Sequence, residues 1–156
     1  EPAMTIDLFP TVARLIDAKL PEHKIDGLDI WPLFAGEKDA KSPHEAYLFY
    51  YDNNQLQALR SGDWKLLFPH RSRSMQGQPV AKDGIPSKYK PLQVGLELYN
   101  LSQDPAETTN LAEKHPEIVA KLTALADKAR ADLGDSLTKQ PGTGRREPGR
   151  VAAAAK

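Results

Sequence analysis

The chain has 156 residues, 40% of them hydrophobic, and its 21 Lys and Arg side chains balance 21 Asp and Glu side chains. This length suits one ordinary domain with a single core, and the neutral charge favours neither nucleic acid nor an anionic membrane as a partner. The absence of cysteine excludes disulfides, thiolate metal sites and a cysteine nucleophile, and no apolar run approaches the roughly 18 residues that would span a bilayer.

The first predicted element is an amphipathic helix from about Asp7 to Ala18. Apolar residues recur along one helix face at spacings of four, seven and eight, namely Leu8, Val12, Leu15 and Ile16. Residues 20–39 then combine prolines and glycines with apolar anchors, which predicts an ordered loop with one short helical turn. The small and charged residues at 37–43 indicate a boundary.

A change of period after this boundary predicts an antiparallel sheet. Three strands are expected around the turn sequences DNNQ and SGD, over Glu45–Tyr51, Leu56–Arg60 and Trp64–Phe68. These turns are too short for a parallel crossover. Residues 69–94 are polar and rich in Pro and Gly, so we expect an irregular loop there, and residues 95–101 predict a fourth strand.

The chain after the fourth strand predicts two helical segments. Asp104 and Glu107 have the spacing of a capping box, which predicts one short helical turn. A longer helix is expected from Pro116 to a stop at Gly134, with one apolar face that covers the sheet. Residues 135–156 have little to bury and predict a flexible tail.

Sequence motifs of catalysis and metal binding are missing. Asp52, Asn53 and Asn54 resemble a cation-ligand cluster, but one carboxylate and two amides between strands are more typical of a turn. The four histidines lie apart without the spacing of zinc ligands: His23, His44, His70 and His115. Neither G-x-S-x-G, G-x-x-x-x-G-K-[ST] nor G-x-G-x-x-G occurs, so we expect no catalytic residue and no metal ligand in this chain.

The candidate binding residues lie in the stretch HRSRS, which follows the third strand. His70, Arg71 and Arg73 can aim an imidazole and two guanidinium groups at an anion. A solvated basic loop is the alternative interpretation.

Two further cations lie on adjacent strands of the preceding hairpin. Arg60 and Lys65 would add to the same positive patch, or form a surface pair with Asp63 or Glu45.

Five sequence blocks follow one another between Met4 and Leu133: MTIDLFPT, KIDGLDIWPLFAGE, PHEAYLFYY, LQALRSGDWKLLF and GLELYNLSQDPAETTNLAEKHPE. In this order they resemble the C-terminal part of the type I sulfatases, the arylsulfatase-like branch of the alkaline phosphatase superfamily. The resemblance implies an α+β fold, in which a four-stranded antiparallel sheet carries a packed C-terminal helix (residues 44–134). Residues 1–36 would be a helix and loop from the end of a larger α/β catalytic domain, and residues 37–43 a linker.

The same resemblance implies a parent enzyme that hydrolyses sulfate esters. Such sulfatases use a formylglycine, made from the Cys or Ser of a C/S-x-P-x-R motif, and a calcium ion held by Asp and Asn side chains. This chain contains no such motif. We therefore expect an inactive fragment that packs on the missing catalytic domain, walls its cleft and contributes specificity for an aryl sulfate or a sulfated glycan.

The expected substrate-binding residues of this fragment are His70, Arg71, Arg73 and Arg60. The family resemblance also points to a periplasmic or secreted enzyme. Two alternatives stay open, a free-standing protein-interaction module and a non-catalytic sulfatase relative.

Overall fold

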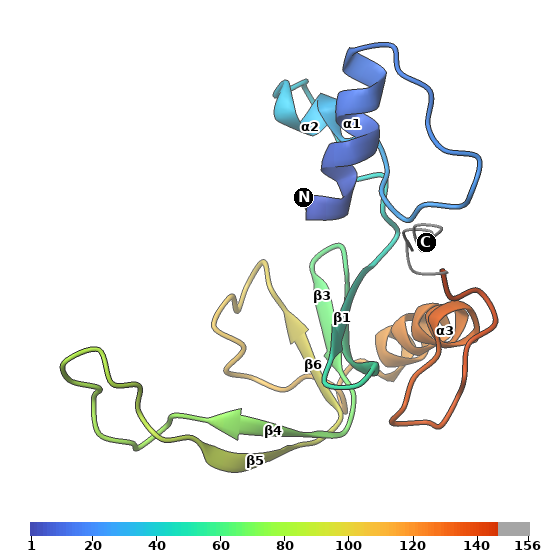
Figure 1. Ribbon diagram of the computed structural model, residues 1–156. Coiled ribbons are helices and arrows are strands. Elements are labelled where there is room, and N and C mark those ends of the chain that lie inside the picture. Colours follow the sequence, from blue (N-terminus) through green and yellow to red (C-terminus); the bar gives the residue numbers. More distant parts are fainter. Residues whose placement is uncertain (147–156) are drawn as a thin grey trace, which may run out of the picture.

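A helical unit opens the chain, at the top of Figure 1. The computed structural model describes residues 1–146, and its first elements are η1 (Thr5–Asp7), α1 (Leu8–Leu15) and α2 (Trp31–Phe34). The predicted first helix is present, but α1 ends before Ala18, where Asp17 takes a left-handed backbone conformation with φ of 53°. The apolar face that predicted this helix is exposed, and the opposite face is buried against the loop that follows.

The buried carboxyl group of Asp7 joins this unit to His44, which lies just ahead of the sheet. It accepts hydrogen bonds from the amides of Met4 (2.8 Å) and Leu28 (2.9 Å), and its Oδ1 lies 2.7 Å from His44 Nε2. Burial by itself raises the pKa of Asp7, but the bonds from Leu28, Met4 and His44 outweigh it and lower the pKa below its ordinary value. Gly27 passes so close to Ile6 that a Cβ atom there would collide with the Ile6 carbonyl oxygen, so a side chain is excluded.

The predicted four-stranded antiparallel sheet is confirmed. Its strands are β1 (Tyr47–Tyr51), β2 (Gln55–Ser61), β3 (Trp64–Leu67) and β6 (Glu97–Asn100), in the order β1-β2-β3-β6. Helix α3 (Pro116–Leu133) covers one face of this sheet, as the sequence predicts (Figure 1). The core between sheet and helix consists of Leu56, Leu59, Leu66, Phe68, Leu98, Leu122, Leu125 and Ala126. Each buried leucine stabilises the fold by roughly 1.5 to 3 kcal/mol, so this interface is the main source of stability.

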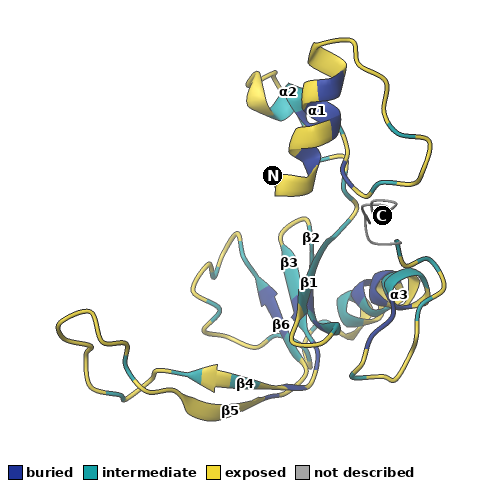
Figure 2. Cartoon of the chain, viewed as in Figure 1, coloured by how far each residue is buried: buried dark blue, intermediate teal, exposed yellow. Residues whose placement is uncertain are grey.

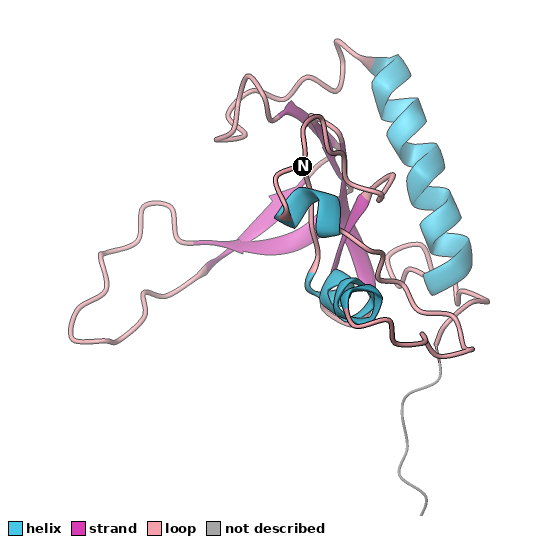
Figure 3. Cartoon of the chain, turned by 90° about the horizontal axis from the view of Figure 1, so that it is seen from above, coloured by secondary structure: helices cyan, strands magenta, loops and turns pink. Residues whose placement is uncertain are grey.

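The expectation of an irregular loop at residues 69–94 is wrong at both ends. β4 (His70–Ser74) and β5 (Lys90–Val94) pair with each other as a separate two-stranded sheet. Residues 69–94 therefore form a hairpin, called here the arm, which runs away from α3 in Figure 3 and is mostly exposed in Figure 2. At its tip the Ile85 amide donates to the Lys82 carbonyl oxygen, and Asp83 and Gly84 both have positive φ angles (54° and 73°). A polar sequence forms strands here because β4 and β5 bond to each other, so little burial is needed.

The predicted capping box after the fourth strand is also wrong. The Asp104 carboxylate accepts from the amides of Thr108 (2.7 Å) and Thr109 (2.9 Å), and the backbone at Glu107 is left-handed (φ 55°), so the segment is a loop. Asn110 then accepts from the Leu98 amide at 3.0 Å and so satisfies a backbone donor of β6. The polar residues of ELYNLSQDPAETTNLA, part of the fifth sequence block, thus hold the loop that follows the sheet.

Residues 135–146 differ from the flexible tail expected over 135–156. The Asp135 carboxylate is fully buried, and it accepts from the amides of Leu56 (3.2 Å) and Leu137 (2.9 Å) and from Arg130 Nε (3.0 Å). The Ser136 amide donates to the Asn54 carbonyl oxygen at 2.9 Å. The segment after α3 therefore returns to the sheet and holds the β1–β2 turn; the rest of the expected tail, 147–156, lies outside the described residues.

A second set of contacts joins this returning segment to the helical unit. Arg146 pairs with Asp26 and, at 3.1 Å, with Asp132, which also binds Lys24 Nζ at 3.1 Å. The hydrogen bonds from Arg146 and Lys24 lower the pKa of the Asp132 carboxyl. Over residues 1–146 no helix has the length and apolar character needed to cross a membrane.

Candidate functional site

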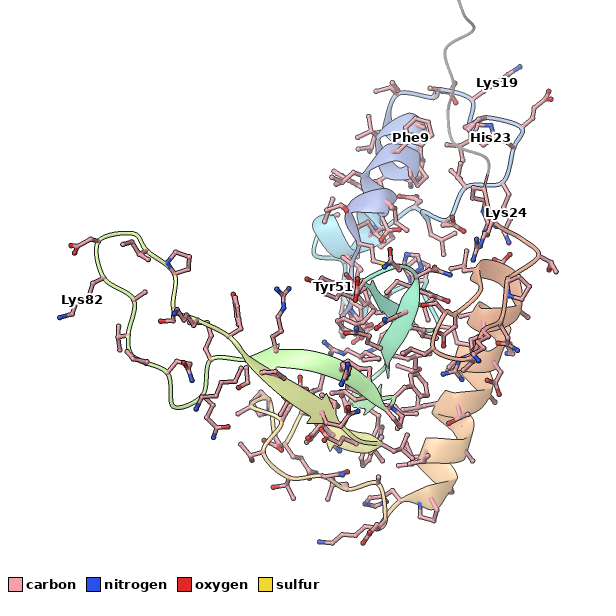
Figure 4. All side chains as sticks on the ribbon, turned by 60° about the horizontal axis from the view of Figure 1, so that its bottom comes forward. Phe9, Lys19, His23, Lys24, Tyr51 and Lys82 are labelled. Carbon is pink, nitrogen blue, oxygen red and sulfur yellow. The ribbon has the colours of Figure 1, made fainter. Side chains whose placement is uncertain are left out.

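A groove of about 810 Å³ lies where the arm leaves the main sheet. Its lining includes two arginines, two tyrosines, a carboxylate and an amide: Arg71, Arg73, Tyr51, Tyr89, Asp52 and Gln57. These residues come from the end of β1, the turn after it, β2 and the arm. Figure 4 shows Tyr51 at the sheet and Lys82 far out on the arm, so the groove lies at the base of the arm and Lys82 lies beyond it.

The period of a strand places Arg71 and Arg73 together. Side chains two residues apart point to the same face, and burial along β4 alternates accordingly, with both arginines exposed. Opposite them in the register lie Gln93 and Pro91, and Tyr89 continues that face toward the tip. The arm thus presents two guanidinium groups side by side.

Two tyrosines fix the orientation of Arg73. Its Nη2 donates to the Tyr51 hydroxyl oxygen at 3.0 Å, and its guanidinium carbon lies 5.1 Å from the centre of the Tyr89 ring. A guanidinium within about 6 Å of an aromatic face is attracted by the ring electrons. Arg73 therefore keeps one orientation and leaves its remaining N–H donors available.

Arg71 has no such partner. Across residues 1–146 its guanidinium takes part in no hydrogen bond or ion pair, and its side chain is exposed on the groove. The carboxylate in the lining is Asp52, which limits how much negative charge the groove accepts at that end. An exposed guanidinium beside a fixed one can bind carboxylate, sulfate or phosphate oxygens with two parallel bonds.

His70 and Arg60 lie apart from this pair. The His70 ring is 7% exposed, and its Nδ1 lies 2.7 Å from the Phe68 carbonyl oxygen, so Nδ1 carries the proton and donates. Arg60 Nε donates to the Gly62 carbonyl oxygen in the β2–β3 turn at 3.0 Å. The structure thus brings together two of the four expected binding residues, and neither His70 nor Arg60 is part of the groove lining.

Lys65 pairs with neither of the carboxylates expected from the sequence. Its ammonium lies 2.7 and 2.9 Å from the two carboxylate oxygens of Glu107 and 5.2 Å from the centre of the Phe49 ring. Trp64, its neighbour in the hairpin, packs against His115 with the two rings tilted by 55° and 5.2 Å between ring centres. The cation and the aromatic of the β2–β3 hairpin therefore anchor the loop that leads to α3.

The turn interpretation of Asp52, Asn53 and Asn54 is confirmed. All three have positive φ angles (38°, 54° and 64°), and the Asn54 amide donates to the Leu133 carbonyl oxygen at 3.2 Å. Within the described part of the chain, no three His, Asp or Glu side chains are close enough to hold a metal ion. The side chains of Asp52, Asn53 and Asn54 do not fit the calcium site that the family resemblance implies for the parent enzyme.

Sequence reasoning missed Tyr51, Tyr89 and the arm itself. The dipeptide Asp83-Gly84 was the available signal, because Asp-Gly favours the tight turn of a hairpin whose two central residues have positive φ. Pairing outward from that turn gives another register than the observed one, in which His70 lies opposite Val94, so the dipeptide marks a hairpin but does not predict the bounds of β4 and β5. Tyr51 and Tyr89 carry no local signal, because only the tertiary fold brings them to Arg73.

Comparisons of the sequence with known proteins all point to the sulfatases. A family model described as the C-terminal region of aryl-sulfatase matches residues 42–146. The steryl-sulfatase of Mus musculus is 34% identical over 151 residues, which cover 85% of this chain and 23% of that protein. The arylsulfatase A of Homo sapiens is 32% identical over 154 residues, covering 90% of this chain and 29% of that protein.

The crystal structure of the PsFucS1 sulfatase from Pseudoalteromonas sp. has the same fold over this region. It aligns with a TM-score of 0.60 at 22% identity, over 88% of this chain and 26% of that one. The chain thus spans about a quarter of the length of the curated relatives it matches. The extent of the family match shows that the chain belongs to the arylsulfatase family, of which it carries the C-terminal region.

Proposed function

We propose that this chain is the C-terminal region of an enzyme that hydrolyses sulfate esters, and that its groove binds the leaving-group side of the ester. The observation that carries the proposal is the pair of exposed guanidinium groups on one face of β4, one fixed by two tyrosines and one without a hydrogen-bond or ion-pair partner in the described part of the chain. Family membership supplies the reaction class.

Differences among the relatives support a role in specificity. They include a steryl-sulfatase and an N-acetylgalactosamine-6-O-sulfatase, so members of this family differ in the alcohol that leaves. Hydrolysis adds water to the ester and releases that alcohol and inorganic sulfate. A region that binds the alcohol side affects which ester reacts without touching sulfur.

In this proposal each groove residue has one task. Arg73, held by Tyr51 and Tyr89, gives a donor of constant direction. Arg71 moves onto an anionic or hydroxyl group of the leaving alcohol, where a charge-assisted hydrogen bond contributes roughly 1.5 to 3 kcal/mol. Asp52 disfavours a second negative charge at its end of the groove.

For the whole enzyme we propose the chemistry that the family resemblance implies, with a formylglycine nucleophile and a calcium ion, both outside this chain. The C/S-x-P-x-R motif is absent from these 156 residues. We also propose that the exposed apolar face of α1 packs on the catalytic domain. That face consists of Leu8, Phe9, Val12, Leu15 and Ile16.

Kinetics of the full-length enzyme test the proposal. We expect Arg71→Ala and Arg73→Ala each to lower kcat/KM for an extended anionic sulfate ester by roughly tenfold to a hundredfold, the equivalent of one charge-assisted contact. The loss on a small aryl sulfate should stay below about threefold, because that ester has no group to reach the groove. Lys121→Ala, an exposed cation on α3, is the matched control.

Two results would contradict the proposal. Equal losses on all esters would indicate that both arginines act on the structure and not on substrate choice. Unchanged kinetics on all esters would support the alternative interpretation, in which both arginines are solvated and bind no substrate.

A further inference from the structure

The arm carries a charge imbalance that the neutral chain as a whole does not. Residues 69–94 contain one acidic side chain, Asp83, and five cations: Arg71, Arg73, Lys82, Lys88 and Lys90. All five cations are exposed, and within residues 1–146 none of them forms an ion pair. By contrast, Lys24, Lys65 and Arg130 are each paired with a carboxylate. The arm is therefore a basic surface whose cations are not paired with carboxylates of the described residues.

These charges extend well beyond the groove. Arg71 and Arg73 lie at its lining, whereas Lys82 is in the turn at the tip, far from Tyr51 in Figure 4. Lys82 follows Arg73 by nine positions, and an extended chain advances about 3.3 Å per residue, so roughly 30 Å is the upper limit of their separation; a turn in which the Gln78 amide donates to the Met75 carbonyl oxygen shortens it. One sugar or one steroid cannot contact both ends, but a polymer can.

We propose that the arm binds an extended polyanion, a sulfated polysaccharide, with one unit in the groove and neighbouring sulfate groups on Lys82 and Lys88. This inference rests on the proposed function and names its substrate class. Exposed cations spaced along a surface attract a polyanion by counterion release and long-range Coulomb forces, which need no preformed pocket at each charge.

An anionic membrane is the competing partner, because Val80 and Ile85 are exposed near the tip. The distribution of charge favours the polysaccharide. Two of the five cations lie in the groove at the base of the arm, next to Tyr51 on the main sheet, where a flat bilayer that touches the tip does not reach. A flexible chain follows the whole length from groove to tip.

The test compares two double variants of the full 156-residue chain that lose the same charge. Lys82→Gln with Lys88→Gln removes two cations near the tip, and Lys114→Gln with Lys121→Gln removes two exposed cations beside and on α3. Fluorescence anisotropy measures binding to labelled dextran sulfate, with unsulfated dextran and vesicles containing phosphatidylserine as the other probes.

We expect dextran sulfate to bind and unsulfated dextran not to bind. The arm variant should bind dextran sulfate about five- to tenfold more weakly than the unchanged chain, and the α3 variant less than twofold. The slope of log Kd against log salt should fall by roughly one to two in the arm variant, by the counterion argument that holds for nucleic acids.

Three results would overturn the inference: no binding of dextran sulfate, equal losses in both variants, or arm-dependent binding of the vesicles alone. Failure of the proposed function is a separate result. If the full-length enzyme releases sulfate from a small aryl sulfate and the arm variant binds dextran sulfate normally, only the inference fails. If the arm binds dextran sulfate as expected but the enzyme releases no sulfate from any ester, the proposed function fails.

Discussion

Replacing Asp135 by alanine should destabilise the chain strongly, because this carboxylate holds the returning segment against the sheet. It is fully buried and serves three donors, the amides of Leu56 and Leu137 and the guanidinium of Arg130. Arg130 itself is buried, with its guanidinium carbon 4.4 Å from the centre of the Phe68 ring. Alanine leaves that charge with the exposed Asp127 as its one carboxylate partner among residues 1–146.

The expected loss is about 3 to 5 kcal/mol of unfolding free energy. Removing one partner of a buried ion pair costs roughly that much, and each orphaned buried amide costs about 1 to 3 kcal/mol when measured alone. The terms overlap, and the remaining bond to Asp127 (2.9 Å) offsets part of the cost. The β1–β2 turn should loosen as well, because the Ser136 amide binds Asn54.

Urea unfolding, followed by tryptophan fluorescence and circular dichroism, measures this loss. Asp127→Ala is the control, since its carboxylate is 62% exposed and an exposed pair contributes about 0 to 1 kcal/mol. A loss below about 1 kcal/mol for Asp135→Ala would refute the reasoning and favour a flexible tail from residue 135 onward.

Three further predictions follow from other contacts. Asp52→Asn should strengthen the binding of an anionic ligand severalfold in a titration, because it removes the groove carboxylate and keeps a residue suited to positive φ; weaker binding would contradict it. Because the pKa of Asp7 is lowered on folding, its carboxylate stabilises the fold at pH values above its ordinary pKa of 3.8. This stabilisation is lost as the pH falls through the folded-state pKa. Asp7→Asn should therefore flatten the acid side of a stability–pH curve, and an unchanged curve would argue against it. The exposed apolar face of α1 should make the isolated 156-residue chain self-associate, and Phe9→Glu with Val12→Glu should reduce that association in sedimentation; equal association would exclude the α1 face as the contact.

Much of the fold could be predicted because local patterns and tertiary packing agree. The strand and turn signals of residues 45–68 fix three antiparallel strands, and the apolar face after Pro116 needs a sheet to cover. β4 and β5 were missed because their residues are polar, and an exposed hairpin is not marked by hydrophobic alternation. Only Asp83-Gly84 marks it.

The candidate site was partly predictable. HRSRS identified Arg71 and Arg73 from composition, and pairing with β5 then placed both on one exposed face. His70 is buried because, one position before Arg71 in β4, it points to the opposite face of the strand. The expectation of an irregular loop could not predict this alternation. Tyr51 and Tyr89 come from segments far apart in sequence, so their contact with Arg73 depends on where the arm leaves the sheet.

A crystal structure of the full-length enzyme with an uncleaved, extended sulfate ester tests the central claim most directly. The account predicts that the leaving-group side of the ester lies in the groove, with the Arg71 guanidinium within about 2.7 to 3.2 Å of an oxygen of the ligand. Arg73 should keep its contacts with Tyr51 and Tyr89 in that complex. A bound ester whose leaving group touches neither arginine, with the groove open to solvent away from the catalytic cleft, would contradict the account.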